Sequence, residues 1–466
     1  MFSLFGPTSS ARQPTRREFL RISGVGTLGM TLPALIEGRA VASTPRTPSF
    51  GRAKHCILLF LTGGPSQLET FDPKPEAPAE IRGEFNAIRT ATTGVYFGEH
   101  LPRLAVRSGD FSIVRSLTHH DTVHTSAGYT MLTGVPHPAA NSPGGAATIK
   151  PASTDHPHYG SLVARFRPAS GGMPSFVALP EVVKDAGVNE MPGQGGGLLG
   201  RRFDPFRIQR DDSPAGFQTP DLVLPVDIAG ARLVDRRRLR EELAELVDAW
   251  PERAAGGEFD GYYRQAFDIL SSPAMSKAFE FEAEPPRVRQ MYGNHLFGRG
   301  CLLARRLVEA GVAMTTVYWH YDGPEDSPSW DTHHNNFRHL RERLLPPADQ
   351  AIAALVDDLK ARGLLDETLV VCLGEFGRTP RISGKAGRGH WPFAQSALLA
   401  GAGIRTGVFG STDRHAAYPE DRPTSPADLA ATILHLLGVD PTLEMRDALG
   451  RPHYVNRGAM IRDLVG

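Results

Sequence analysis

The chain has 466 residues, of which 22% are charged and 41% are hydrophobic, and its 51 Lys and Arg residues balance 51 Asp and Glu residues. This globular composition is long enough for one large α/β domain with insertions or for two domains. The neutral balance gives no reason to expect nucleic acid as a partner, because that needs a basic face. Three cysteines in apolar runs indicate buried thiols rather than a disulfide framework.

Residues 1–42 are predicted to be a twin-arginine signal peptide. Arg16 and Arg17 are followed by a weakly apolar, glycine-containing stretch and by a small-residue cleavage site at 40–42. That stretch is too short and too interrupted to be a stable membrane span, and no other stretch reaches spanning length. We therefore expect export by the twin-arginine machinery, cleavage after Ala42, and a periplasmic or extracellular mature protein.

The mature chain is predicted to begin with a linker at 43–52. Residues 55–62 then form a continuous apolar run ended by Gly-Gly-Pro, which is typical of a fully buried strand. The following loop carries Glu69 and Asp72. Loops at the carboxyl ends of strands build the sites of open α/β sheets, so either carboxylate is a candidate ligand. The alternative is an ordinary loop-capping carboxylate.

A second strand is predicted at 111–117, and a dense polar stretch follows it at the start of a short helix. A helix start offers free N–H groups and a positive dipole end, which suit a phosphate or sulfate. The alternative is a plain helix cap beside surface histidines. The polar side chains singled out here are His119, His120, His124, Thr125 and Ser126.

Residues 53–466 are predicted to form a single domain with a loop-rich and helical insertion at about 135–290. The glycine-rich loop 193–200 lacks the lysine arrangement of a nucleotide-binding loop, and its region is predicted to shape a substrate pocket. Helical patterns are expected at 233–250, 261–270 and 289–310.

The last third of the chain has a clear α/β pattern. A strand at 312–319, a helix at 347–362 and a strand at 368–373 predict a right-handed unit of parallel strands. A further strand is expected at 395–400, and a capped helix begins at Ser425. The predicted class is α/β with a mostly parallel sheet.

Three polar loops next to these strands carry the candidate chemistry. Oxygen and imidazole ligands on short loops suit a hard or borderline divalent cation, and a cation-assisted hydrolase also needs an attacking group and charge stabilisation. Arg378 and Arg388 are candidates to clamp an anionic ester, and Thr125, Ser126 or an activated water is the candidate attacking group. The alternative is a set of hydrogen-bonded loop residues. The candidate ligands are Asp331, His333, His334 and His390, with Glu375 as a further carboxylate.

Several motifs resemble those of the exported bacterial family called domain of unknown function 1501. They are Gly-Gly-Pro-Ser near the first strand, Trp-Asp-Thr-His at 330–333, Gly-Glu-Phe-Gly-Arg-Thr-Pro at 374–380 and Arg-Gly-His-Trp-Pro at 388–392. That family is grouped with the alkaline-phosphatase-like superfamily of sulfatases, phosphatases and phosphoglycerate mutases. The resemblance implies a three-layer α/β/α sandwich with a metal site at the strand ends.

The resemblance also assigns residues, with departures from the superfamily pattern. Asp331, one of the two following histidines and His390 look like one metal site, and Glu375 stands where a second-site Asp is usual. Phe376 replaces the usual next His, so the second site looks incomplete. His124 stands where sulfatases carry the modifiable Cys or Ser, so a formylglycine sulfatase is not expected. His124, with His119 or His120, is a candidate metal ligand instead.

Two functions follow from these patterns. The first is an exported metal-dependent hydrolase of phosphate or sulfate esters, acting on a small molecule or glycan with zinc, manganese or calcium. The second is a catalytically degenerate relative that serves as a binding or structural protein of the cell envelope.

Overall fold

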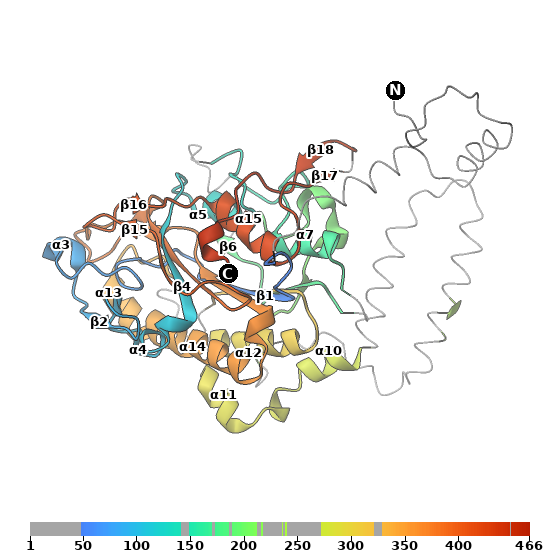
Figure 1. Ribbon diagram of the computed structural model, residues 1–466, viewed down its shortest axis with the longest axis horizontal. Coiled ribbons are helices and arrows are strands. Elements are labelled where there is room, and N and C mark those ends of the chain that lie inside the picture. The colour runs from blue at the N-terminus through green and yellow to red at the C-terminus, as the bar shows by residue number, and fades with distance from the viewer. Residues whose placement is uncertain are drawn as a thin grey trace, which may run out of the picture. The chain divides into compact units, whose positions relative to one another are not determined.

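The computed structural model describes residues 48–466, with gaps at 141–148, 170–172, 186–188, 212–215, 218–234, 236–237, 240–271, 321–328 and 448. Its centre is a β-sheet that includes β1 and β4 (Figure 1). The sheet has eight strands in the order β14-β4-β13-β10-β1-β9-β5-β8. The strands are β1 (His55–Phe60), β4 (Phe111–Leu117), β5 (Phe176–Leu179), β8 (Phe206–Arg207), β9 (Met314–Tyr318), β10 (Thr368–Leu373), β13 (Gln395–Ala400) and β14 (Gly407–Phe409).

The sheet is mostly parallel. Among its described strands, β13 alone runs antiparallel to its two neighbours, β4 and β10, whereas the other neighbouring pairs are parallel. The three central strands β10, β1 and β9 are fully or almost fully buried, as their mostly apolar and β-branched sequences predict.

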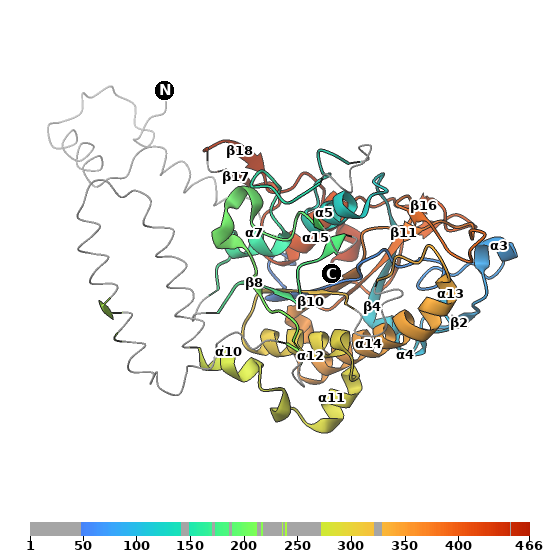
Figure 2. The same cartoon turned by 180° about the vertical axis from the view of Figure 1, so that it is seen from behind.

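Helices cover both faces of the sheet. Alternate residues of β1 belong to two separate cores: Ile57 and Leu59 pack into one, and Leu58 and Phe60 into the other. The first core includes α12 and α14, and the second includes α5, α7 and α15, on the opposite side of the sheet (Figures 1 and 2). The predicted three-layer α/β/α sandwich is confirmed. These helices are α5 (His124–Thr133), α7 (Tyr159–Phe166), α12 (Leu296–Glu309), α14 (Leu345–Ala361) and α15 (Pro426–Leu436).

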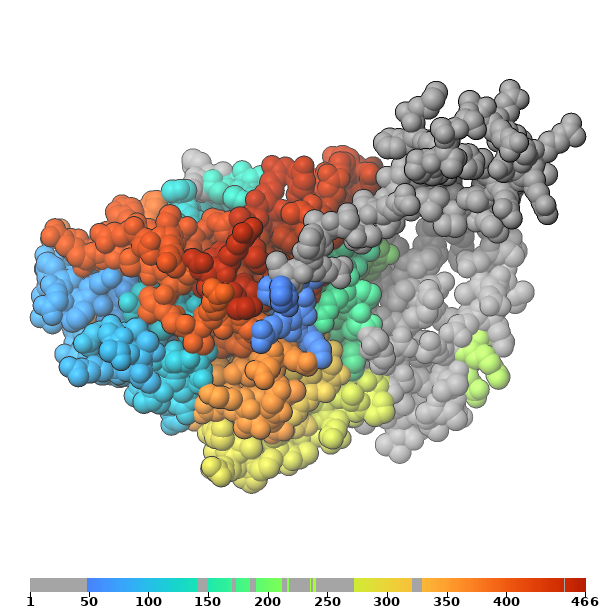
Figure 3. Space-filling model, viewed as in Figure 1, coloured from blue at the N-terminus to red at the C-terminus, as the bar shows by residue number. Residues whose placement is uncertain are grey.

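Smaller elements complete the described fold. Figure 3 shows the start of the described chain against the C-terminal part, where Gly51 N donates to His435 O at 3.0 Å and Ala53 N to Leu436 O at 2.9 Å. Besides short 3₁₀ and π-helical turns, the remaining α-helices and strands of the described residues are β2 (Ala87–Arg89), β3 (Tyr96–Gly98), α3 (Ala79–Arg82), α4 (Pro102–Ala105), β6 (Lys184–Asp185), β7 (Asn189–Glu190), α10 (Pro273–Ala278), α11 (Pro286–Tyr292), α13 (Asn336–His339), β11 (Gly377–Arg378), β12 (His390–Trp391), β15 (Ser411–Thr412), β16 (Pro419–Asp421), β17 (Glu444–Arg446) and β18 (Pro452–Tyr454).

The expected parallel direction of β9 and β10 is confirmed, since both run parallel to β1, which lies between them in the sheet. Two details differ from the expectation. The helix expected at 289–310 is two helices, α11 and α12, because the chain turns at Gly293 with a φ of 90°. The helix expected at 347–362 begins at Leu345, directly after α13 and a π-helical turn at Leu340–Leu344.

Some expectations fall outside the described residues. These are the signal peptide at 1–42, the first part of the linker, and the helices at 233–250 and 261–270, of which only positions 235, 238 and 239 are described. Within the described ranges, no helix has both the length and the apolar character that crossing a membrane requires. The division into a linker and one domain with an insertion stays a prediction.

Candidate metal centre

The candidate site lies at the edge of the sheet where the parallel strands have their carboxyl ends. The chain after β4 leads to His124 at the start of α5, the chain after β9 to Asp331, and the chain after β10 to Glu375. The strand β13 is antiparallel, so the segment that precedes it, with His390 on β12, reaches the same edge. The topology therefore gathers four distant segments at the place where open α/β sheets build their sites.

The loop that carries Asp331 is fixed by its buried neighbour Trp330. The Trp330 side chain is almost fully buried, and its ring packs against the edge of Trp319 at a centroid distance of 5.2 Å. Its main-chain N donates to Thr62 O at 2.9 Å, which ties the loop to the end of β1. The carboxylate of Asp331 is thus held by a rigid neighbour rather than by a free loop.

Three imidazoles converge on one oxygen of this carboxylate. Asp331 Oδ1 lies 3.0 Å from His333 Nε2, 3.2 Å from His124 Nε2 and 3.3 Å from His390 Nε2. One ligand atom from each of the four residues can be chosen so that all lie within 4.8 Å of one another. We call these four residues, His124, Asp331, His333 and His390, the His₃Asp cluster. Its arrangement fits a single divalent cation.

Hydrogen bonds fix the tautomers of two of these histidines. His124 Nδ1 lies 2.5 Å from Glu375 Oε1, and His390 Nδ1 lies 2.7 Å from Thr122 O. A carboxylate and a carbonyl only accept, so each Nδ1 carries the hydrogen. In the neutral rings the lone pairs are then on the Nε2 atoms, which face the cluster. Ligand histidines are oriented in this way through their second nitrogen.

The charges in the cluster are strongly coupled. Burial by itself lowers the pKa of His124, but hydrogen bonds to the Asp331 and Glu375 carboxylates outweigh burial and raise this pKa to about 9. Burial opposes ionisation of Asp331, yet the hydrogen bonds from His124 and His390 and the charge of Arg378 hold its pKa far below the usual range. A proton on His124 Nε2 and a divalent cation would therefore compete for the same place.

Glu375 lies beside the cluster and is fully buried. Its Oε1 accepts from Gly63 N at 2.8 Å and contacts His124, and its main-chain O lies 2.7 Å from His119 Nε2. The next residue, Phe376, packs its ring against the ring of His124, with a centroid distance of 4.8 Å. Glu375 thus touches a cluster histidine, and His119 touches Glu375 rather than the cluster.

Arg378 is buried and holds the loops together. Its guanidinium donates to Gly64 O at 2.9 Å, to Arg388 O at 3.1 Å, to Gly63 O, and to Asp331 Oδ1 at 2.5 Å. The side chain has no exposed surface. In this structure Arg378 therefore keeps Asp331 ionised and in place, and it is not positioned as an exposed clamp for an ester.

Arg388 was predicted to bind substrate, but it lies in the interior. Its side chain has no exposed surface, and it donates to Glu69 Oε1 at 2.6 and 3.0 Å. It also donates to Ile81 O at 2.7 Å, to Thr379 O at 3.0 Å and to Pro380 O. Because its nitrogens are engaged in this way, Arg388 cannot reach a substrate in this structure, and its partner Glu69 is the other half of a buried ion pair.

The other predicted site residues lie outside the His₃Asp cluster. Thr125 and Ser126 are fully buried in the first turn of α5, so neither hydroxyl is exposed to a substrate from solvent. Asp72 is buried and paired with Lys74 at 3.0 Å. His120 and His334 are exposed.

Two main-chain groups of the site were not predicted from the sequence. Gly63 contributes its N–H to Glu375 and its carbonyl to Arg378. An ideal Cβ at Gly63 would lie 2.4 Å from Asp331 N, and the φ of this glycine is 111°, so the position has no room for a side chain. The signal in the sequence was the Gly-Gly pair after β1. The Thr122 carbonyl, which orients His390, left no signal in the sequence because every residue has one.

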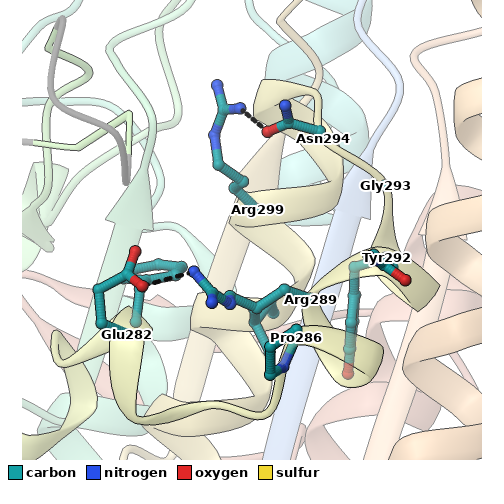
Figure 4. Close-up of a pocket in the computed structure, with 10 residues that line it drawn as sticks. Glu282, Pro286, Arg289, Tyr292, Gly293, Asn294 and Arg299 are labelled. Carbon is teal, nitrogen blue, oxygen red and sulfur yellow. Dashed lines mark hydrogen bonds and ion pairs between the residues drawn. The ribbon is translucent and has the colours of Figure 1, made fainter.

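The cavity in Figure 4 lies elsewhere, in the helical layer beside α11 and α12, and no cluster residue lines it. Its volume is about 290 Å³. Arg289 donates to Glu282 at 2.7 Å and Arg299 to Asn294 at 3.1 Å, so both arginines have partners. The chemistry of the His₃Asp cluster does not involve this cavity.

Comparisons with known proteins give the family. A family model described as "Protein of unknown function (DUF1501)" matches residues 53–465, and the chain belongs to this family. No curated protein matches.

Solved structures match at low similarity. They include the lipoteichoic acid synthase LtaP from Listeria monocytogenes, with 12% identity over 86% of this chain and 76% of that chain and a TM-score of 0.37. A protein in the alkaline phosphatase superfamily from Vibrio parahaemolyticus has 13% identity over 85% and 71%, with a TM-score of 0.38. The PsFucS1 sulfatase from Pseudoalteromonas sp. has 11% identity over 97% and 80%, with a TM-score of 0.39. Likenesses this distant do not assign an activity to the chain.

Proposed function

We propose that this DUF1501 protein is a metal-dependent hydrolase of phosphate or sulfate esters. The observation that carries the proposal is the convergence of three histidine Nε2 atoms on one oxygen of Asp331. An ordinary hydrogen-bonded loop has no need for two histidines whose Nδ1 atoms are both tied back, so that both Nε2 atoms face the same carboxylate.

The donor set favours zinc over the other candidate metals. Calcium takes six to eight oxygen ligands, and manganese prefers carboxylate, carbonyl and water. Three imidazole nitrogens and one carboxylate oxygen match the nitrogen-rich, four-ligand sites of zinc. The Nε2 atoms of His333 and His390 lie 2.8 Å apart, so both nitrogens are close enough to be ligands of one ion.

The residues around the cluster have separable roles in such a reaction. A divalent cation bound there would polarise the ester and activate a water molecule. Asp331 remains ionised because Arg378 and the histidines surround it. The side chain of His333 is 42% exposed, so the cluster is open to solvent on that side and an ester can approach there. Water is the proposed attacking group, because Thr125 and Ser126 are buried.

The proposal includes where the protein acts. The twin-arginine pattern before residue 42 motivates export of the folded chain, and the ester would then be a small molecule or a glycan outside the cytoplasm. Cell fractionation tests this part separately. Replacement of Arg16 and Arg17 by lysine is expected to retain the protein in the cytoplasm, and unchanged export would reject the twin-arginine route.

Metal content is the first test of the enzyme proposal. The protein from Ser43 onward is purified beside Asp331→Ala and, as a control for loss of a buried carboxylate, Asp349→Ala, and each is examined by elemental analysis. We expect near-stoichiometric metal in the unaltered protein and in Asp349→Ala, and none in Asp331→Ala. Metal-free protein after reconstitution with zinc, manganese or calcium would reject the site.

Turnover is the second test. A panel of phosphate and sulfate esters is assayed with the metal-loaded protein, and hydrolysis that disappears in Asp331→Ala supports the enzyme. Bound metal without turnover favours the alternative of a cell-envelope binding protein. The burial of Thr125 and Ser126 would then account for the lack of turnover, because no hydroxyl of these residues can attack an ester.

A further inference from the structure

Resting on the proposed metal site, we propose that Glu375 is a positioning residue that orients His124 toward the metal and is not itself a ligand. This assignment replaces the role that its place at a strand end suggests, since a carboxylate there is expected to bind metal directly. The distinction matters because it decides whether one carboxylate, Asp331, or two carboxylates, Asp331 and Glu375, bind the cation directly.

The geometry puts an imidazole ring between two carboxylates. His124 Nδ1 lies 2.5 Å from Glu375 Oε1, and His124 Nε2 lies 3.2 Å from Asp331 Oδ1. The ring therefore separates the bonding oxygen of Glu375 from the oxygen on which the cluster converges. Glu375 is accordingly absent from the group of residues whose ligand atoms can meet at one ion, among the described residues.

One carboxylate oxygen of Glu375 and its main-chain O have close partners, whereas the buried Oε2 has no hydrogen-bond partner among the described residues. Its carboxylate has no exposed surface, and Oε1 also accepts from the main-chain N of Gly63 at 2.8 Å. Its main-chain O lies 2.7 Å from His119 Nε2. Glu375 lies in a short bend two residues after the end of β10 and two residues before the start of β11, so its main chain is anchored on both sides. A carboxylate fixed in this way selects one tautomer and one ring orientation of His124.

The chemical consequence is an imidazole prepared for a metal. Glu375 accepts the Nδ1 hydrogen, so the Nε2 lone pair of the neutral ring is directed at the cluster. A carboxylate on the second nitrogen also makes the ring a better donor, and loss of such a partner typically weakens metal affinity about 10- to 100-fold. Phe376 packs against the same ring, with a centroid distance of 4.8 Å, and limits its rotation.

The experiment compares zinc affinity in five forms of the mature chain: unaltered, Glu375→Ala, Glu375→Gln, Asp331→Ala and Asp349→Ala. Asp349 is the matched control, because it is 3% exposed and accepts from two main-chain N–H groups, of Arg103 and Leu104, as a buried carboxylate outside the cluster. Competition with a chromogenic chelator gives the affinity. Proton NMR of the zinc-loaded protein reports the downfield imidazole N–H that the Nδ1–carboxylate bond produces.

We expect Glu375→Ala to weaken zinc binding about 10- to 100-fold and to lose one downfield N–H resonance. Glu375→Gln keeps an oxygen for His124, so it should recover most of the affinity and retain a shifted resonance. Asp349→Ala should lose stability but not affinity.

Two results would overturn the role assigned to Glu375 without affecting the proposed function, and a third result would overturn both. Unaltered affinity in folded Glu375→Ala means that His124 needs no positioning. Loss of zinc in Glu375→Gln as complete as in Asp331→Ala means that Glu375 is a direct ligand. No zinc binding by the unaltered chain would reject the proposed function, and this inference with it.

Discussion

Replacing Arg378 tests whether one guanidinium holds the site together before any metal binds. Arg378→Met removes the donors but keeps most of the side-chain length, so the cavity left behind is small. The change leaves the carbonyls of Gly63, Gly64 and Arg388 without their donor, and it leaves Asp331 without its cation at 2.5 Å.

The expected cost follows from those contacts. Breaking a fully buried ion pair from one side typically costs about 3–5 kcal/mol, and each further hydrogen bond to a charged group contributes about 1.5–3 kcal/mol. The Asp331 side chain is 33% exposed, so water replaces part of the lost interaction. The histidines near Asp331 and the desolvation that the buried guanidinium no longer requires offset part of this sum. We therefore expect Arg378→Met to lower the free energy of unfolding by about 3–5 kcal/mol. Arg378→Lys keeps the charge but cannot reach all four acceptors, and it should cost roughly half as much.

Urea unfolding of the metal-free protein, followed by tryptophan fluorescence, measures these values. The control is Arg89→Met, because Arg89 is exposed on β2 and its loss should change stability by less than about 0.5 kcal/mol. If Arg378→Met unfolds at the same midpoint as Arg89→Met, the buried guanidinium does not hold the loops, and our account of how Asp331 is positioned fails.

Three further predictions concern pH, backbone crowding and metal removal. Burial lowers the pKa of His158 to about 3, so this residue stabilises the fold above pH 6.5 and loses that contribution as pH falls toward 3, by at most about 1.4 kcal/mol per unit. His158→Asn keeps a side-chain acceptor for Gly160 N, and it should reduce the fall in the free energy of unfolding below pH 6.5, as measured by urea unfolding. An unchanged pH dependence in this variant would contradict the prediction. Gly63→Ala should abolish metal binding, because the added Cβ would clash with the main chain of Asp331. The control is Gly311→Ala: Gly311 has a φ of 97° but open space where a Cβ would lie, so this change should lower stability and leave metal binding intact. Metal titration measures both variants, and equal metal affinity would show that Gly63 has room for a side chain. Chelation of the metal should lower the melting temperature, with zinc at 100 times its Kd restoring about 2.7 kcal/mol, and a melting temperature insensitive to chelator would exclude a bound metal.

The fold could be predicted where the chain has continuous apolar runs. The strands β1 and β10 are such runs, and β4, β9 and β13 are largely apolar or β-branched; each was expected within a few residues of its observed bounds. The short strands β5, β8 and β14 were not expected, because two to four residues give no periodicity. The order of the strands in the sheet could not be predicted either, because the sequences of β9 and β10 do not indicate that β1 lies between them.

The candidate site was predictable as a set of residue types but not as a geometry. His124, Asp331 and His390 attract notice because imidazoles and carboxylates are dense near strand ends. The sequence could not say that His334, next to a cluster residue, is exposed and lies outside the cluster. It also could not say that Arg388 pairs with Glu69, because that contact joins positions 319 residues apart. Such pairings depend on the packing of the whole sheet rather than on local pattern.

The way the site is assembled has a consequence for synthesis of the chain. Gly63, His124, Asp331, Glu375 and His390 come from segments spread over more than 300 positions, and Gly63 meets Glu375 across 312 of them. A chain still emerging from the ribosome cannot present the full donor set until the segment around residue 390 has been made and β13 has joined the sheet. Under the proposed function, metal capture would be a late event that reports on a completed fold, and a truncated or misassembled molecule would not bind metal.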